Sequence, residues 1–251
     1  MKILVAFKIL PDDQDIRVAA DGSLDFSKAK PIVSSYDANA MEEAAQLAKA
    51  CGAEVVGITV GSSAIDDSKV KKNALSRGLD RLVMVADDTC DNLDSHATAA
   101  VLTQIAEKEA GWDLILCGDG SADNYAQQVD VQLAAALGAP SVNGVTSIKL
   151  QDGCIVCERA LESSIETVEV SLPAVVSVTP SIAEARVPGM KDILAAGKKP
   201  VEALVLETDL SASVEVVSVK APDQASRACE VLEAGEDRAI EKVAAAIRAA
   251  L

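Results

Sequence analysis

The chain has few aromatic residues and a single histidine. Its 251 residues include two tyrosines, two phenylalanines and one tryptophan, so few rings are available to stack on a nucleotide base. His96 is the only histidine that a Ser-His-Asp or Cys-His mechanism could use, and it lies in a helical pattern with no partner at a recognisable spacing. We therefore expect His96 to be a surface or capping residue.

Basic residues are also scarce. The 23 lysines and arginines stand against 39 aspartates and glutamates, which gives a formal net charge of −16. Nucleic-acid binding requires a clustered basic surface, and the pair Lys198-Lys199 is too short to provide one. We therefore expect no nucleic-acid partner.

Long apolar runs are missing. No run approaches the roughly 20 residues that a membrane-spanning helix needs. The opening MKILVAFKIL lacks the cleavage region of a signal peptide and predicts a first strand instead. We expect no membrane insertion and, by default, a cytoplasmic location.

The cysteines show no pattern typical of a metal or redox site. Cys154 and Cys157 form a CxxC, but no second pair or nearby histidine completes a zinc set, and the segment alternates like a strand. We expect the cysteines to be reduced, half-buried small side chains and predict no metal site. The six are Cys51, Cys90, Cys117, Cys154, Cys157 and Cys229.

What the sequence does contain is an alternation of short apolar runs and longer amphipathic segments. The continuous apolar runs predict strands buried on both faces, at 3–7, 55–60, 81–86, 114–118 and 174–179. Between them, apolar residues at helical spacing and terminal glycines predict helices at 39–52, 68–79, 97–111 and 125–138. This order predicts an α/β fold that is doubly wound around a mainly parallel sheet.

Two segments depart from this order. Residues 141–172 alternate in short stretches separated by turn signals, which predicts an antiparallel insertion. Residues 182–210 have scattered apolar residues, two prolines and several basic residues, and we expect them not to pack back as a regular layer. We predict a nucleotide-binding domain over 1–181 and, over 182–251, a partner-binding arm with a terminal helix near 226–250, with a mobile tail as the alternative.

The loops after the strands are the candidate binding site, because ligands of open parallel sheets bind beyond the carboxyl ends of the strands. The small residues of 117–128, which follow the strand at 114–118, let a ligand approach the backbone, and the next helix offers N–H groups to a phosphate. A simple turn is the alternative. The segment matches neither GxGxxG nor GxxxxGK[ST], which disfavours the common dinucleotide and P-loop sites.

Tyr36 and Asp37 each have two interpretations. Tyr36 could stack against a base or simply pack at the start of a helix, and Asp37 could contact a ligand or cap that helix. No paired carboxylates, metal ligands or activated nucleophile can be connected by spacing. The residues therefore favour binding over catalysis.

Six segments in order resemble the electron transfer flavoprotein β family over nearly the whole chain. They are MKILVAFK, YDANAMEEAAQL, ALSRGLDR, DLILCGDGSADNYAQQV, LPAVVSVT and EARVPGMKDILAAGKKPVE. The GDGSAD form resembles the branch associated with carnitine and acyl-CoA pathways and with nitrogen-fixation gene sets. The resemblance implies an adenine nucleotide α hydrolase-like fold and a subunit that transfers electrons without converting a substrate.

The resemblance also implies cofactors and partners. Family members bind AMP in the β chain, or a second FAD in electron-bifurcating members, while the main FAD belongs chiefly to an α subunit. The choice between AMP and FAD stays open. Met190 matches the apolar residue of a loop that docks into a partner dehydrogenase, and its flexible thioether suits that role, although packing within the arm or on the α subunit is the alternative.

Nucleotide contacts of the family, carried onto matching positions, cluster in the same loops. Two departures affect them: Ser34-Ser35 replaces Asn-Pro, and Val129-Asp130 replaces Thr-Gly, where an acid would be unfavourable beside a phosphate unless it faces away. The implied cofactor-binding residues are Ala6, Ser34, Ser35, Tyr36, Asp37, Val60, Tyr125, Ala126, Gln127, Gln128, Val129, Asp130 and Val131, with the phosphate near the helix start at 127–131.

Two other functions share this architecture. A stand-alone ATP-binding regulator of the universal-stress type would need an extended glycine-rich phosphate loop, and the chain has none. An adenylating enzyme of the ATP-pyrophosphatase type would need Ser-Gly-Gly-x-Asp-Ser after the first strand, and this is also missing.

Overall fold

The computed structural model covers residues 1–251 and describes all of them except 208–209, 211–213, 215, 224–228, 234 and 251. The chain forms two compact units. The main unit comprises Met1–Arg17 and Asp25–Ser218, and the small unit comprises Val18–Leu24 and Val219–Leu251. Among the described residues, every helix is too short or too polar to cross a membrane.

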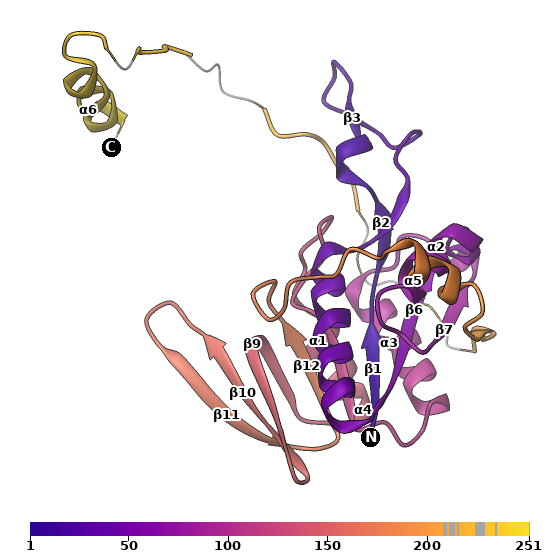
Figure 1. Ribbon diagram of the computed structural model, residues 1–251. Helices are drawn as coiled ribbons and strands as arrows, with labels where there is room; N and C mark the ends of the chain where they lie inside the picture. Colours follow the sequence, from indigo (N-terminus) through magenta and orange to yellow (C-terminus); the bar gives the residue numbers. More distant parts are fainter. Residues whose placement is uncertain (208–209, 211–213, 215, 224–228, 234, 251) are drawn as a thin grey trace. The chain divides into compact units, whose positions relative to one another are not determined.

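A nine-stranded sheet forms the centre of the main unit, in the order β11-β10-β9-β12-β8-β1-β6-β7-β13 (Figure 1). Neighbours from β9 to β13 run parallel, and β10 and β11 add antiparallel strands at one end. The predicted α/β fold with a mainly parallel sheet is therefore confirmed. The strands are β1 (Lys2–Ala6), β6 (Glu54–Gly61), β7 (Arg81–Ala86), β8 (Leu114–Gly118), β9 (Ser141–Gln151), β10 (Cys154–Ala160), β11 (Ile165–Ser171), β12 (Ala174–Val178) and β13 (Val201–Ala203).

Helices cover both faces of this sheet, as a doubly wound fold requires. Successive side chains of a strand point to opposite faces, so Leu116 packs with Met41 of α1 in one core and Ile115 packs with Leu102 of α3 in the other. The helices of the main unit are α1 (Ser35–Cys51), α2 (Ser68–Leu75), α3 (Ser95–Lys108), α4 (Val129–Leu137) and α5 (Met190–Ala196). Two of them, α1 and α4, end at glycines in the left-handed conformation, Gly52 and Gly138.

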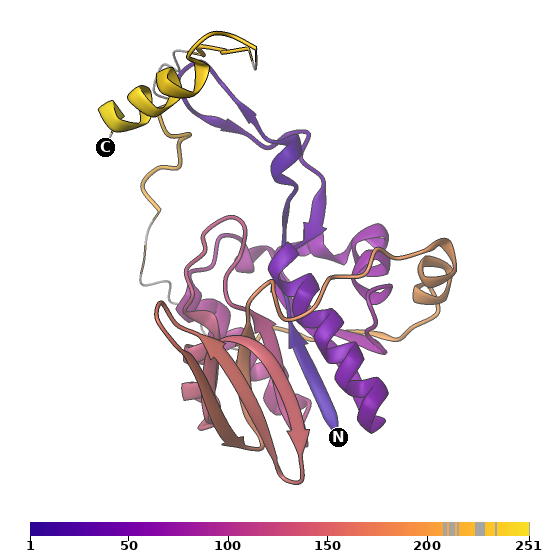
Figure 2. The same ribbon diagram turned by 60° about the vertical axis from the view of Figure 1, so that its left-hand side comes forward.

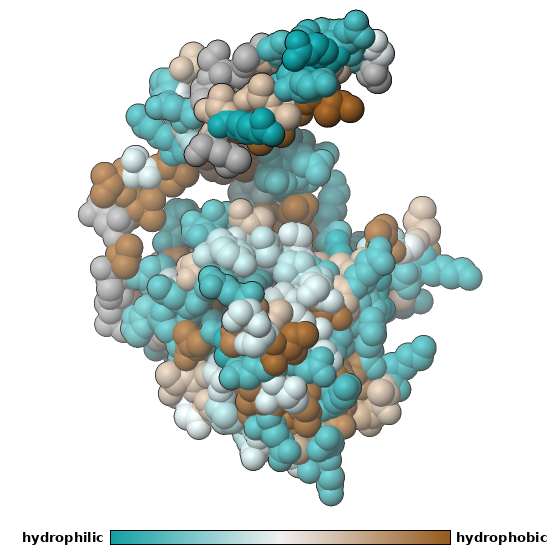
Figure 3. Space-filling view, turned by 90° about the vertical axis from the view of Figure 1, so that its left-hand side faces the viewer, coloured by the Kyte–Doolittle hydropathy of each residue, from teal (hydrophilic) through white to brown (hydrophobic). Residues whose placement is uncertain are grey.

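The predicted antiparallel insertion is present at residues 141–171. β9, β10 and β11 form a meander that extends the sheet beyond β12 (Figure 2). β9 itself runs parallel to β12, so only the next two strands reverse direction. Charged Glu166 and Glu169 on the outer strand protect this open edge against pairing with other chains. On the face of the main unit seen in Figure 3, apolar side chains are scattered among polar ones.

The stretch after Ile182, which we expected not to pack back as a regular layer, adds one short strand to the sheet. β13 pairs in parallel with β7, and Leu204 donates its N–H to the carbonyl of Met84. The outer edge of β7 offered unpaired backbone groups, and pairing with β13 satisfies them. Arg186, earlier in the same stretch, binds Glu42 of α1 through two hydrogen bonds of 2.5 and 3.1 Å.

The remaining elements are short. β2 (Ile9–Pro11) pairs with β5 (Pro31–Val33), and β3 (Arg17–Val18) pairs with β4 (Leu24–Asp25). Single 3-10 turns complete the description: η1 (Asp13–Asp15), η2 (Ser63–Asp66) and η3 (Asp88–Cys90).

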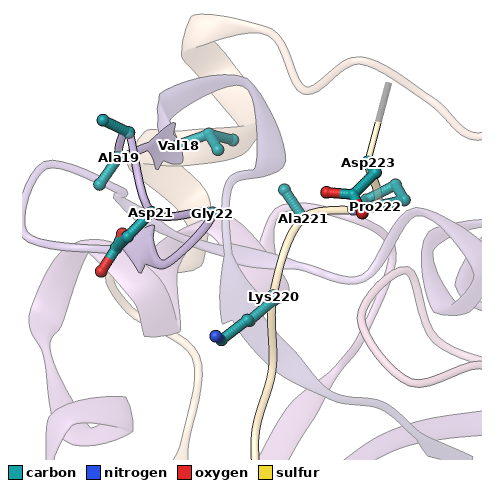
Figure 4. Close-up of a pocket in the computed structure, with 9 residues that line it drawn as sticks. Val18, Ala19, Asp21, Gly22, Lys220, Ala221, Pro222 and Asp223 are labelled. Carbon is teal, nitrogen blue, oxygen red and sulfur yellow. The ribbon is translucent and has the colours of Figure 1, made fainter. Parts of the chain in front are cut away.

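The small unit joins a hairpin tip to a C-terminal segment. Ser23 bridges to Lys220, and an open hollow is lined by 18–22 and 220–223 (Figure 4). Its helix α6 (Ala239–Ala250) is shorter than the predicted one, whose start near Ser226 lies outside the described residues. Residues 235–238 form turns, and the positive φ of Arg238 ends any backward extension of α6.

Candidate functional site

The candidate site lies where the strand order reverses. β1 has β6 on one side and β8 on the other, so the chain winds in opposite directions from this point. Open α/β sheets bind their ligands in the crevice outside the carboxyl ends of such strands. Here those ends are Ala6, which is buried, and Gly118.

Asp37 connects the two strand ends. Its carboxylate accepts hydrogen bonds from the backbone N–H of Lys8 at 2.8 Å and from that of Gly118 at 2.9 Å. Ser34 occupies the N-cap position of α1, so Asp37 is not the cap of that helix. Burial raises the pKa of Asp37 to about 7, although both backbone donors and the charge of Lys8 oppose the shift.

Gly118 allows α1 to approach β8 closely. A Cβ at this position would stand 2.7 Å from the Cβ of Tyr36 and 2.9 Å from Oδ1 of Asp37. Both distances are well below van der Waals contact, so any larger residue would push α1 away from the strand. The glycine is thus a condition for the hydrogen bonds of Asp37.

The loop 119–128 brings the two tyrosines of the chain together. The ring centroids of Tyr36 and Tyr125 are 5.3 Å apart at a tilt of 49°, and Tyr125 donates its hydroxyl to Oδ2 of Asp119 at 3.1 Å. Tyr125 and Gln127 have φ values of 42° and 54°, which are costly for residues with a side chain. Such backbone conformations gather at ligand sites, where the surrounding structure holds them.

A second contact fastens the same loop to β1. Lys8 Nζ lies 2.5 Å from the carboxylate of Asp123, and Ser121 donates to the other oxygen of that carboxylate at 2.5 Å. Burial opposes ionisation of Asp123, but these two donors outweigh it and hold the pKa of Asp123 below its usual range. The loop is therefore held by the charged contact with Lys8 and by the ring contact of Tyr125 with Tyr36.

α4 begins at Val129 and not at Tyr125 as predicted, so residues 125–128 belong to the loop. Asp130, in its first turn, is buried and accepts a hydrogen bond of 2.5 Å from Ser177 of β12. Its carboxylate thus faces the sheet. The replacement of the family's Thr-Gly by Val129-Asp130 therefore does not place an acid in front of the N–H groups at the start of α4.

Two buried polar atoms at this edge have no partner within the described part of the chain. They are Oγ of Ser34, a residue with no exposed surface, and Oδ1 of Asp119. Buried polar atoms are nearly always hydrogen-bonded, so an orphaned pair at one edge indicates groups that a ligand satisfies. Burial also raises the pKa of Asp119 above its usual range.

A family model described as the electron transfer flavoprotein domain matches residues 23–209, well over half of the chain. The chain belongs to this family. Electron transfer flavoproteins carry electrons and generally bind FAD or AMP. They are heterodimers, and they work together with partner dehydrogenases. The matched region contains the start of α1 and the whole loop 119–128, whereas β1 and Lys8 precede it.

In this electron transfer flavoprotein, the structure brings together most of the residues predicted to bind a cofactor. Residues 34–37 and Ala6 border the carboxyl ends of β1 and β8, and Tyr125 contacts Tyr36 there. Asp130, at the start of α4, binds Ser177 of β12, the strand that pairs with β8. Val60 lies near the carboxyl end of β6, the next strand along the sheet. Met190 lies apart from them, at the first position of α5, and its side chain is 76% exposed.

Sequence reasoning did not assign roles to Lys8, Gly118, Asp119 or Asp123, although all four stand in its candidate loops. Their contacts join residues far apart in the chain, such as Lys8 and Asp123. One signal was readable: Lys8 is a cation directly after the first strand of an acidic chain.

The cysteines and the histidine take no part in the site chemistry that the geometry shows. Cys117 is buried at the end of β8, and burial, helped by Asp130, Asp37 and Asp119, raises the pKa of its thiol. His96 is exposed and its Nδ1 lies 3.3 Å from Gln132. No group of three His, Cys, Asp or Glu residues able to hold a metal occurs within the described ranges.

Proposed function

We propose that the chain is the β subunit of an electron transfer flavoprotein and that it binds an adenine nucleotide, AMP or FAD, at the edge of β1 and β8. With an FAD-bearing α subunit it relays electrons between dehydrogenases or reductases and an acceptor, in acyl-CoA or carnitine metabolism. The family match supports electron transfer. The observation that supports this edge as the nucleotide site is the pair of bonds from Asp37 to the ends of β1 and β8.

The residues at this edge fit an adenine nucleotide. Tyr36 and Tyr125 supply aromatic surface, and the orphaned oxygen of Asp119 can accept a hydrogen bond from a ribose hydroxyl or an exocyclic amine. The start of α4 supplies N–H groups for a phosphate, because Asp130 is turned toward Ser177. A flavin would supply the redox chemistry when bound, and the chain's own residues bind and orient it.

The C-terminal region over 182–251 contacts the α subunit in this proposal. Its helix α6 exposes Ile240, Val243 and Ile247, which lie on one helical face. Met190 is the proposed docking residue for a partner dehydrogenase, and its exposure leaves the thioether accessible. The family match does not favour the alternative of a stand-alone ATP-binding regulator.

The test is to co-express the chain with its α subunit, purify the complex and identify the nucleotides released by denaturation. Two FAD per heterodimer would support electron bifurcation, and one FAD with one AMP would support simple electron transfer. A complex that contains neither flavin nor adenine nucleotide contradicts the proposed function.

A further inference from the structure

Lys8 is the basic side chain that the contacts place at the candidate site. Its ammonium group extends from the end of β1 to Asp123 in the loop 119–128, at 2.5 Å. The Lys8 side chain is 42% exposed and the Asp123 side chain is 34% exposed. The pair is thus open to solvent, and each partner can exchange the other for a new contact without unfolding the strand or the loop.

The field around this pair is acidic. Asp37, Asp119 and Asp130 stand at the same edge. The negative charges of all three raise the pKa of the Cys117 thiol at the end of β8. The charge of Asp123 likewise raises the pKa of the Asp37 carboxyl, whereas the charge of Lys8 lowers it and favours the ionised form. Asp130 faces Ser177, but a phosphate that enters this edge meets repulsion from the carboxylates of Asp119 and Asp123 unless a cation compensates it.

We propose that Lys8 is the phosphate-recognition residue of this site and that Asp123 is its internal competitor. Without a nucleotide, Asp123 holds the ammonium group. When a nucleotide binds, its phosphate replaces Asp123 and the loop 119–128 is released from β1. The site therefore selects phosphorylated adenine nucleotides over the nucleoside. This inference rests on the proposed nucleotide-binding function.

The exchange is energetically modest. A solvent-exposed ion pair contributes little to stability, so giving up Asp123 costs little, and the flexible lysine side chain can turn toward a new anion. The doubly charged phosphate offers Lys8 a stronger partner than one carboxylate does. The orphaned atoms of Ser34 and Asp119 at the same edge are consistent with a ligand that completes the site.

The test measures the affinities of AMP and adenosine for the full-length chain by calorimetry after endogenous nucleotide has been removed. Lys8→Met should weaken AMP binding about tenfold, and Lys8→Arg should keep part of it. Asp123→Asn removes the competitor and should strengthen AMP binding by up to about fivefold, the factor that 1 kcal/mol represents. None of the three substitutions should change the affinity for adenosine.

The matched control is Lys71→Met, which removes another lysine from a 2.5 Å pair with an aspartate, Asp66, in η2. It should leave both affinities unchanged. If Asp123→Asn weakens AMP binding, or if Lys8→Met leaves it unchanged while the original chain binds AMP, the exchange is wrong and the proposed function stands. If the original chain binds neither compound, the exchange is wrong, and the nucleotide content of the heterodimer decides the proposed function separately.

Discussion

At the scale of single residues, Asp37 connects the ends of β1 and β8, because its buried carboxylate accepts hydrogen bonds from the backbone N–H groups of Lys8 and Gly118. In Asp37→Asn, the amide nitrogen would face one of these N–H groups. We expect the substitution to lower the free energy of unfolding by roughly 1–3 kcal/mol and to weaken AMP binding. Urea unfolding and AMP titration measure the two effects.

The control for Asp37→Asn is Asp80→Asn. Asp80 accepts the N–H of Val55 at 2.8 Å, at the opposite end of the sheet. The Asp80→Asn variant should lose some stability and retain the affinity for AMP. Equal affinities for AMP in both variants would contradict the role of Asp37 at the site.

Glu43 predicts a pH dependence. Burial, together with the adjacent Glu42, raises the pKa of Glu43 from 4.5 to about 7 in the folded chain. The folded state therefore binds a proton more tightly than the unfolded chain, and the stabilisation is lost as the pH rises from 4.5 through 7. Glu43→Gln should raise the free energy of unfolding by up to about 3 kcal/mol at pH 8 and leave it nearly unchanged at pH 4. Urea unfolding of the original chain and of the variant at both pH values measures this. An equal change in the free energy of unfolding at pH 4 and at pH 8 would refute the prediction.

At the scale of elements, the contact of α1 with β8 depends on Gly118. Gly118→Ala forces a Cβ to within 2.7 Å of Tyr36, so the helix must move away from the strand. We expect a loss of about 1–3 kcal/mol in stability together with weaker AMP binding. Gly197→Ala is the control, because Gly197 has a helical backbone and its Cβ would come no closer than 3.4 Å to any atom, so neither quantity should change much. A Gly118→Ala chain with unchanged stability and affinity would show that the close approach is unimportant.

The sequence predicted the parallel strands well because a buried strand is a local signal. The runs at 81–86 and 114–118 match β7 and β8 residue for residue. It missed β13, since pairing with β7 joins residues more than 100 positions apart. It also placed the start of α4 too early, because helical spacing cannot reveal the positive φ of Tyr125 and Gln127.

In the candidate site too, local sequence signals revealed some features, and contacts between distant residues stayed hidden. Strand ends and small residues located the loops, and Tyr36 and Tyr125 were notable as the only tyrosines. The contacts that build the site, from Lys8 to Asp123 and from Asp37 to Gly118, require the order of strands in the sheet. Strand order is set by packing of the whole domain, so no local pattern could supply these pairs.

At the scale of the whole molecule, the exposed face of α6 should bind the α subunit. Ile247 is 55% exposed on that face, and Ile247→Asp should weaken the heterodimer about tenfold, or 1.4 kcal/mol. Ala249→Asp adds the same charge on the opposite side of α6 and should have little effect. Binding of each variant to the α subunit can be measured by titration. Equal losses in the two variants would indicate a general charge effect.

The most direct test of the nucleotide site is photolabelling of the heterodimer with 8-azido-AMP, followed by tryptic peptide mapping. We expect the label on peptides 29–49 and 109–149, which contain Tyr36 and Tyr125, and we expect excess AMP to prevent the labelling. Label that AMP displaces only from other peptides would contradict a nucleotide site at the carboxyl ends of β1 and β8.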